Sequence, residues 1–195
     1  MAEITQVLGN WAHESRDRKN LVFEALYAQL RRLAGQQLRR QGDGIDLQPT
    51  VLVHEAYLRL VDLDRISING RAHFFGLAGR LMREILVDEA RHARAQKRDR
   101  ALETRLTGEF LGSGVDLDAL LLLDQTLTEL GELDPDYLWL VDARVFGGLT
   151  IEEAAGGLGI SPATVKRKWK VARAWITERL KDSEDGALRE LTRQL

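Results

Sequence analysis

Apolar residues recur at intervals of three and four positions in almost every periodic segment of the chain, and no segment shows a sustained alternation of apolar and polar residues. This spacing gathers apolar side chains on one face of an α-helix, whereas alternation would indicate a strand. We therefore predict an all-α protein. The expected helices, with ends placed to within about two to four residues, are Ile4–Glu14, Asn20–Gln41, Thr50–Asp62, Arg71–Arg98, Leu117–Leu130, Asp136–Phe146, Thr150–Gly157 and Ser161–Lys181.

The apolar pattern weakens between Asp99 and Gly114, where Gly108, Gly112 and Ser113 also appear. Such a stretch is typical of a flexible linker. We therefore predict two small helical domains joined by a flexible linker. The expected divisions are a first domain over residues 1–98, a linker over 99–116, a second domain over 117–182 and a C-terminal tail over 183–195.

Charge is distributed unevenly although the net charge is only −2. Residues 101–160 hold twelve acidic and two basic side chains, whereas residues 161–181 hold seven basic and one acidic. A second basic stretch closes the first half and contains Arg91, Arg94, Lys97, Arg98 and Arg100. Two separate basic elements favour two separate contacts with a polyanion such as nucleic acid.

The segment after Leu149 contains the capping and turn residues expected of two short helices joined by a turn. Thr150 and Glu153 are spaced as a capping box, and Gly159 can adopt the left-handed conformation that a tight turn needs. Ser161 followed by Pro162 is a suitable N-cap and first residue for the second helix. This pattern predicts a helix-turn-helix, the motif that places its second helix in the major groove of DNA.

The second helix has an apolar stripe, small residues near its start and a basic outer face. A solvated basic helix is the alternative interpretation, but here the charges coincide with the caps, the turn and the apolar stripe, so we favour DNA binding. Base readers are expected in the first turns. The candidate DNA-binding residues are Ser161, Ala163, Thr164, Lys166, Arg167, Lys168, Lys170 and Arg173.

Three stretches of the chain resemble the ECF sigma factors, small members of the sigma-70 family that keep only the second and fourth sigma domains. GLTIEEAAGGLGISPATVKRKW, which ends at Trp169, resembles the domain that reads the minus-thirty-five element. LVHEAYLRLV, from Leu52 to Val61, resembles the helix that docks on the clamp helices of the largest polymerase subunit. REILVDEARHARAQKR, from Arg83 to Arg98, resembles the end of the helix that meets the minus-ten element. The resemblance covers nearly all of the chain.

The resemblance implies a transcription initiation factor whose partners are promoter DNA and core RNA polymerase, through its clamp helices and flap. It also suggests a serine/threonine kinase or an anti-sigma factor as a further partner, since the chain is similar to the kinase-associated subgroup. The implied polymerase-binding residues are Leu52, Glu55, Tyr57 and Arg59. The implied minus-ten residues are Ser67, Asn69, His73, Arg80, Arg83, Arg91, Arg94, Lys97 and Arg98.

Thr50 is a candidate phosphorylation site because the chain departs from the family just before the helix that docks on polymerase. ECF factors typically carry acidic residues there, whereas this chain has the sequence Leu-Gln-Pro-Thr. Phosphorylation would supply the missing negative charge at a helix N-terminus. The alternative is that Thr50 serves only as a helix cap.

Other functions fit the sequence less well. His54-Glu55 begins like a zinc-protease helix, but Leu58 stands where the second ligand would be, and no glycine-rich nucleotide loop is present. We expect no catalytic activity, no metal and no cofactor. A stand-alone helix-turn-helix regulator explains the C-terminal half equally well, but it does not explain the second basic stretch. An interaction module such as an anti-sigma-like adaptor would leave the charges of the basic helix without a role. With no cysteine and no long apolar run, a cytoplasmic protein without a membrane contact is expected.

Overall fold

The computed structural model describes residues 2–41, 45–63, 68–107 and 117–181, and this part of the chain contains helices and loops but no strand. The prediction of an all-α fold is thus confirmed for the described residues. The elements are α1 (Ala2–Gly9), η1 (Trp11–His13), α2 (Arg16–Gln41), α3 (Pro49–Val61), α4 (Gly70–Thr107), α5 (Leu117–Leu133), α6 (Pro135–Val141), η3 (Asp142–Phe146), α7 (Ile151–Leu158) and α8 (Pro162–Leu180). None of the described helices is long and apolar enough to cross a membrane.

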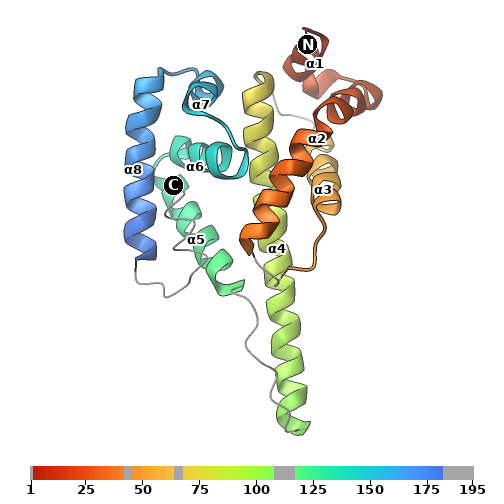
Figure 1. Ribbon diagram of the computed structural model, residues 1–195, viewed down its shortest axis with the longest axis vertical. Coiled ribbons are helices and arrows are strands. Elements are labelled where there is room, and N and C mark those ends of the chain that lie inside the picture. The colour runs from red at the N-terminus through yellow and green to blue at the C-terminus, as the bar shows by residue number, and fades with distance from the viewer. Residues whose placement is uncertain (1, 42–44, 64–67, 108–116, 182–195) are drawn as a thin grey trace.

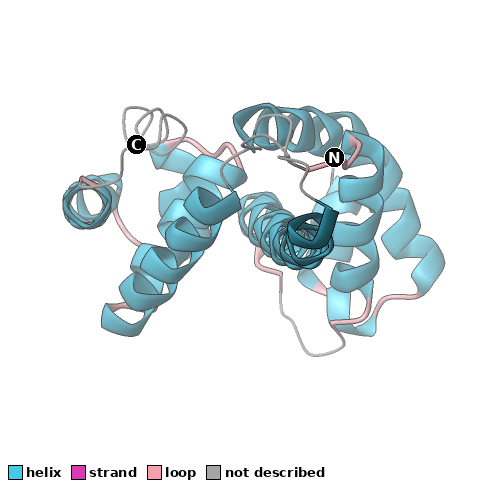
Figure 2. Cartoon of the chain, turned by 90° about the horizontal axis from the view of Figure 1, so that it is seen from below, coloured by secondary structure: helices cyan, strands magenta, loops and turns pink. Residues whose placement is uncertain are grey.

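The long helix α4 runs through the middle of the molecule, with α1 to α3 on one side and α5 to α8 on the other (Figures 1 and 2). On the first side α4 packs against α1, α2 and α3, and on the second it packs against α5, η3 and α7. One hydrophobic cluster contains buried residues of both sides and of α4 between them. Examples are Leu26 of α2, Met82 of α4 and Phe146 of η3. The two halves therefore share a core across α4.

The N-terminal side is held together by aromatic residues. Trp11 is fully buried, its ring lies edge-on to that of Phe74 with the ring centroids 6.0 Å apart, and its indole Nε1 donates a hydrogen bond to the Leu60 carbonyl at 3.3 Å. Because the indole N–H is satisfied, the whole side chain can be buried without an unpaired polar atom. These contacts join η1, α3 and α4.

The helix-turn-helix has the predicted caps. The Thr150 hydroxyl accepts from the Glu153 backbone N–H at 3.1 Å, and the Glu153 carboxylate accepts from the Thr150 N–H at 2.9 Å. Gly159 ends α7 in the left-handed conformation with φ 66°, and Ser161 caps α8 through the Thr164 N–H. The capping box, the turn glycine and the N-cap are thereby confirmed.

Three boundaries differ from the expectation. The helix expected over Ile4–Glu14 is α1, which ends at Gly9, followed by the short 3-10 helix η1. The helix expected over Asp136–Phe146 is α6 followed by η3, a π-helical turn in which the Gly147 N–H donates to the Asp142 carbonyl at 2.8 Å. Helix α4 continues to Thr107, so residues 99–107 of the predicted linker are helical. Residues 108–116 and 183–195 lie outside the described part of the chain, and the division into two domains stays a prediction.

Candidate nucleic-acid and polymerase interfaces

The outer face of α8 is basic and exposed. Lys166, Arg167, Lys170 and Arg173 are all solvent-exposed, and none of them forms an ion pair within the described residues. On the opposite face, Val165 and other members of the predicted apolar stripe are buried. Because α8 lies at the edge of the molecule (Figure 1), its cationic face is open to a large partner.

Around the start of α8, Ser161 and Ala163 are also exposed, and Thr164 is half-buried. The Ser161 hydroxyl bonds to the Thr164 hydroxyl as well as to the Thr164 N–H. Most of the predicted DNA-binding residues of α8 thus lie in its exposed first turns; Arg173 is exposed farther along the helix, and Lys168 is the exception.

Lys168 points inward to the start of α6. Its ammonium group pairs with Asp134 and with Asp136, the latter at 2.9 Å, and lies 5.1 Å from the centre of the Tyr137 ring. The hydrogen bond from Lys168 lowers the pKa of Asp134, and the same bond raises the pKa of Lys168. In this arrangement Lys168 anchors α8 to α6, a role that the sequence pattern did not indicate.

The predicted polymerase-binding residues of α3 divide between its two faces. Leu52 is fully buried, and Tyr57 is buried with its ring stacked on Phe23 at 4.0 Å between centroids and its hydroxyl donating to Asn20. Glu55 is half-buried. Leu52 and Tyr57 therefore pack in the core of the N-terminal side and offer little free surface to a partner.

Two apolar residues that sequence reasoning missed are exposed on α3. Val51 is 42% exposed and Leu58 is 50% exposed. They are seven residues apart and therefore lie on the same helix face. That spacing was the available signal, because it places two apolar residues on the helix face opposite the core stripe.

A cleft between α2 and α3 adjoins Leu58. Its volume is about 540 Å³, and its aromatic lining includes Phe23, Tyr27, His54 and Tyr57. An aromatic cleft beside exposed aliphatic residues is the kind of surface that a partner helix can bury. The described structure thus brings together the exposed apolar residues of α3 and an aromatic cleft shared with α2.

Arg59 contacts a neighbouring helix. Glu55 stands four residues before it in α3, the spacing of a helical ion pair, but the Arg59 guanidinium pairs with Asp88 of α4 at 3.0 Å. The two side chains are 40% and 42% exposed. A pair this exposed adds little stability, and both charges stay accessible to a partner.

His73 lies near the start of α4 at the boundary between the two halves. The Asn69 backbone N–H donates to its Nδ1 at 3.1 Å, and its ring centroid is 6.4 Å from that of Trp139. Burial lowers the pKa of His73 from its ordinary value of 6.5. Both the burial and an Nδ1 that accepts a hydrogen bond favour the neutral form of the His73 ring.

Three of the predicted minus-ten arginines of α4 pair with nearby carboxylates. Arg80 pairs with Glu84 at 2.8 Å, and Arg94 pairs with Asp118 of α5 at 3.1 Å. Arg91 pairs with Asp124 of α5 at 3.1 Å. Asn69 and Arg98 are exposed, Ser67 lies outside the described residues, and so does the side chain of Lys97.

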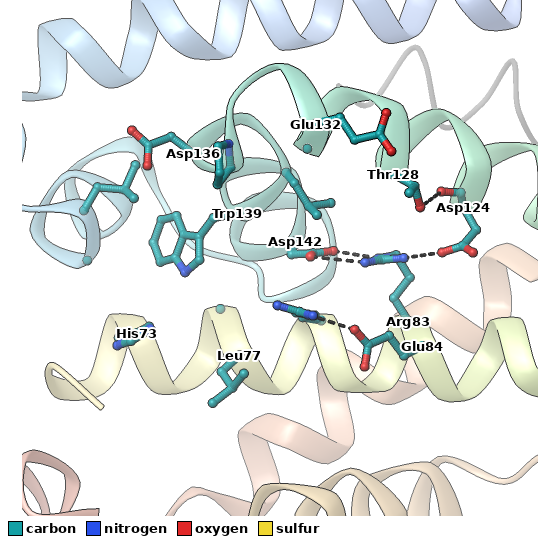
Figure 3. A pocket seen from close by; sticks show the side chains of 17 residues that line it. His73, Leu77, Arg83, Glu84, Asp124, Thr128, Glu132, Asp136, Trp139 and Asp142 are labelled. Carbon is teal, nitrogen blue, oxygen red and sulfur yellow. Dashed lines mark hydrogen bonds and ion pairs between the residues drawn. The ribbon is translucent and has the colours of Figure 1, made fainter. Parts of the chain in front are cut away.

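Arg83 is the most deeply placed of the predicted minus-ten residues. Only 5% of its side chain is exposed, and its Nε is 2.7 Å from Asp142 Oδ1 while one Nη is 2.5 Å from Asp124 Oδ1. Figure 3 shows it extending from α4 between these two carboxylates, in a cleft of about 770 Å³ that also contains His73 and Trp139. In this arrangement Arg83 binds the C-terminal half and is not available to DNA.

The charge on Arg83 depends on its partners. Burial works against the charged form, but Asp142 and Asp124 outweigh it and raise the pKa of Arg83. Burial also raises the pKa of Asp142, since only 2% of that side chain is exposed, and Arg83 opposes this rise. Each charge is therefore tolerated in the interior because the other is there.

Comparison with known proteins supplies the context for these surfaces. A family model described as "ECF sigma factor" matches residues 1–182. No curated protein and no solved structure matches the chain. Within the described residues, no group of three histidine, cysteine, aspartate or glutamate side chains is arranged to hold a metal ion.

Proposed function

The chain belongs to the ECF sigma factor family, and from this premise we propose how its surfaces divide the work of transcription initiation. Members of this family are not enzymes; they are transcription factors that bind core RNA polymerase and promoter DNA. In our proposal, α8 reads the minus-thirty-five element, α4 and the loop before it engage the minus-ten element, and α2 and α3 bind polymerase. Together they direct polymerase to one regulon.

The exposed cationic face of α8 is the observation that carries this proposal. Its first turns present Thr164, Lys166, Arg167 and Lys170 on a helix fixed by caps at its start and an apolar stripe beneath. Side chains at this position of a helix-turn-helix reach base edges in the major groove. Arg173, farther along the helix, is suited to a phosphate.

The α3 face supports the polymerase part of the proposal. Val51 and Leu58 are exposed beside the aromatic cleft, and Glu55 and Arg59 add polar groups around them. We assign this surface to the clamp helices of the largest polymerase subunit, and we assign a contact with the polymerase flap to the C-terminal half. An apolar centre with a polar rim is the usual composition of a protein interface.

The proposal is tested by measuring binding to core polymerase and to duplex DNA separately. We expect the purified chain to bind core polymerase and, alone, to bind duplex DNA weakly, since two small basic surfaces cannot both engage a promoter until polymerase fixes their separation. Tight, sequence-selective duplex binding without polymerase would instead identify the chain as a stand-alone helix-turn-helix regulator.

Replacing Arg167 by alanine should weaken binding to a selected minus-thirty-five element by about 1 to 3 kcal/mol, because a bidentate contact to a base edge is lost. Selectivity at that base pair should relax as well. The control is Arg173→Ala, which should weaken binding to all sequences alike. The measurement is competition by matched and scrambled elements for the reconstituted holoenzyme, and equal behaviour of the two variants would show that α8 is rotated from the assigned orientation.

Thr50 is not the N-cap of α3. Gln48 occupies that position without a side-chain cap bond. Thr50 lies within the first turn, where its carbonyl oxygen accepts a hydrogen bond from His54 Nδ1 at 2.7 Å. The explanation of Thr50 as a helix cap is therefore wrong. Next to Thr50, Pro49 lines a cleft of about 450 Å³ together with Arg31, Arg32 and Arg39 of α2.

These features support the proposal that a serine/threonine kinase modifies Thr50 and thereby gates polymerase binding. A phosphate there would add negative charge to a helix start that has no side-chain cap, one residue after Pro49, which lines the cleft with the three arginines. Kinase-treated chain and Thr50→Glu should bind core polymerase more tightly than untreated chain, and Thr50→Ala should not respond to the kinase. If untreated chain and Thr50→Ala are both fully active, Thr50 is not a switch. An anti-sigma factor is a second regulator in this proposal.

A further inference from the structure

Three arginines of α2 line one cleft beside the start of α3. Arg31, Arg32 and Arg39 are all exposed, and no acidic side chain is among the described residues that line the cleft with them and Pro49. None of the three forms an ion pair within the described residues, whereas four arginines of α4 each pair with a carboxylate. A cleft lined by charge of one sign concentrates ions of the opposite sign. The cleft is therefore suited to an anion.

Gly35 opens the floor of this cleft. Tyr27, Arg31, Gly35 and Arg39 follow one another at intervals of four residues, so they lie along one stripe of α2. A Cβ added at Gly35 would lie 3.4 Å from Arg39 Nη1 and 3.9 Å from Pro49 Cγ. The Arg39 guanidinium and the first residue of α3 thus meet over a helix position that has no side chain. A larger residue at position 35 would fill the space between them.

Thr50 follows Pro49 directly and is half-buried at the start of α3, which packs beside α2 (Figure 1). This helix start has no side-chain cap, and its partial positive charge favours an anion there. The nearest carboxylate before it in the chain, Asp46, is exposed and forms no ion pair within the part of the chain that the structure describes. A phosphate on Thr50 would thus meet arginines that no described carboxylate engages.

We propose that Arg31, Arg32 and Arg39 form a phosphate-binding site whose ligand is the phosphate group on Thr50 of the same chain. The inference rests on the proposed function, because it takes Thr50 as the modified residue. The kinase transfers the γ-phosphoryl group of ATP to Thr50 Oγ1, the hydroxyl proton is lost and ADP leaves. The phosphate then pairs with guanidinium groups across Gly35 and joins α3 to α2.

This pairing changes the surface that a partner meets on α2 and α3. The phosphate brings close to two negative charges, which offset most of the positive charge of the three arginines. Because arginine forms paired hydrogen bonds with phosphate oxygens, the link between the two helices has a fixed geometry. The phosphate thus acts within the chain, by neutralising and ordering the surface that the proposed function assigns to polymerase.

The test follows the phosphate itself. The full chain is made with phosphothreonine at position 50 by an expanded genetic code, which needs no kinase, and the phosphate is titrated by phosphorus NMR. Its second pKa should fall from the ordinary value of about 6 to about 5 or below, because guanidinium groups stabilise the dianion. The midpoint of thermal unfolding should rise by about 2 to 4 °C relative to the unmodified chain, since the phosphate joins two helices.

Two sets of variants separate the cleft from general charge. In Arg31→Gln/Arg39→Gln the pKa of the phosphate should return to about 6. The control, Arg18→Gln/Arg179→Gln, removes two charges from arginines outside the cleft and should leave that pKa low. Gly35→Leu fills the cleft without changing any charge, and it should raise the pKa of the phosphate as well. Its own control is Gly35→Ala, whose methyl group makes only ordinary contacts.

The outcomes separate this site from the proposed function. A phosphate pKa that stays at about 6, or that both arginine pairs change equally, would overturn the phosphate site and leave the gating by Thr50 standing. A low pKa that rises when the protein is diluted would show that a second copy supplies the arginines, which overturns binding within one chain. If the pKa is low but the phosphate leaves binding to core polymerase unchanged, the gating fails and the phosphate site stands.

Discussion

Replacing Asp142 by alanine is expected to lower the free energy of unfolding by about 3 kcal/mol or more, because the variant leaves the Arg83 guanidinium buried with Asp124 as its remaining partner. The surface variant Asp136→Ala also removes a carboxylate from an ion pair, with Lys168, but that pair is much more exposed. It should cost at most about 1 kcal/mol. Chemical denaturation followed by circular dichroism measures both values.

A companion variant separates charge from packing at Asp142. In Arg83→Met/Asp142→Leu both charges are removed and apolar volume is kept, so much of the lost stability should return. Equal losses in Asp142→Ala and Asp136→Ala would contradict the account, since they would show that Arg83 is not held in a dry interior. The two single variants change the net charge equally, and the comparison therefore does not depend on overall electrostatics.

Gly79→Ala should destabilise the protein by about 2 to 3 kcal/mol, because the added methyl group has no space to occupy. Its Cβ would lie 2.6 Å from the Gly147 nitrogen, 2.8 Å from the Phe146 carbonyl carbon and 2.9 Å from the Asp142 carbonyl oxygen. All of these are backbone atoms, so no side-chain rotation relieves the clash. The relief that remains is a shift of η3 away from α4, which would also loosen the ion pairs of Arg83.

The control for Gly79 is Gly156 of α7, where nothing lies within 4 Å of an added Cβ. Alanine there should stabilise the helix by about 0.5 to 1 kcal/mol, since the backbone freedom of glycine is removed without a clash. Thermal unfolding of the two variants should therefore shift in opposite directions. A Gly79→Ala protein as stable as wild type would show that α4 and η3 are not packed as closely as described.

The features that the sequence predicted correctly are local ones. Thr150 and Glu153, Gly159 and Ser161 act on residues two to four positions away, so their spacing alone specifies the caps and the turn of the helix-turn-helix. The apolar stripe of α8 was readable for the same reason, because helical periodicity is a short-range property. The basic residues that share this helix could thus be placed on its outer face, except Lys168, which pairs with Asp134 and Asp136.

Contacts between distant residues were not predictable in this way. Arg83 and Asp142 are 59 residues apart, and their meeting depends on the π-helical turn η3 and on the glycines that let it approach α4. From sequence alone, Arg83 was one of several basic residues that the resemblance implied for the minus-ten element, and the carboxylate nearest to Arg59 at helical spacing was Glu55. The structure gives both arginines partners on other helices, because tertiary packing decides among carboxylates that sequence spacing treats alike.

The central claim is most directly tested by transcription with core RNA polymerase reconstituted with the purified chain. A library of promoter fragments should give transcripts that begin at a fixed distance downstream of shared minus-thirty-five and minus-ten elements, and only when the chain is present. The account predicts that these transcripts disappear when the basic face of α8 is neutralised at Lys166, Arg167 and Lys170. The same transcripts with and without the chain would contradict its assignment as a promoter-selecting factor.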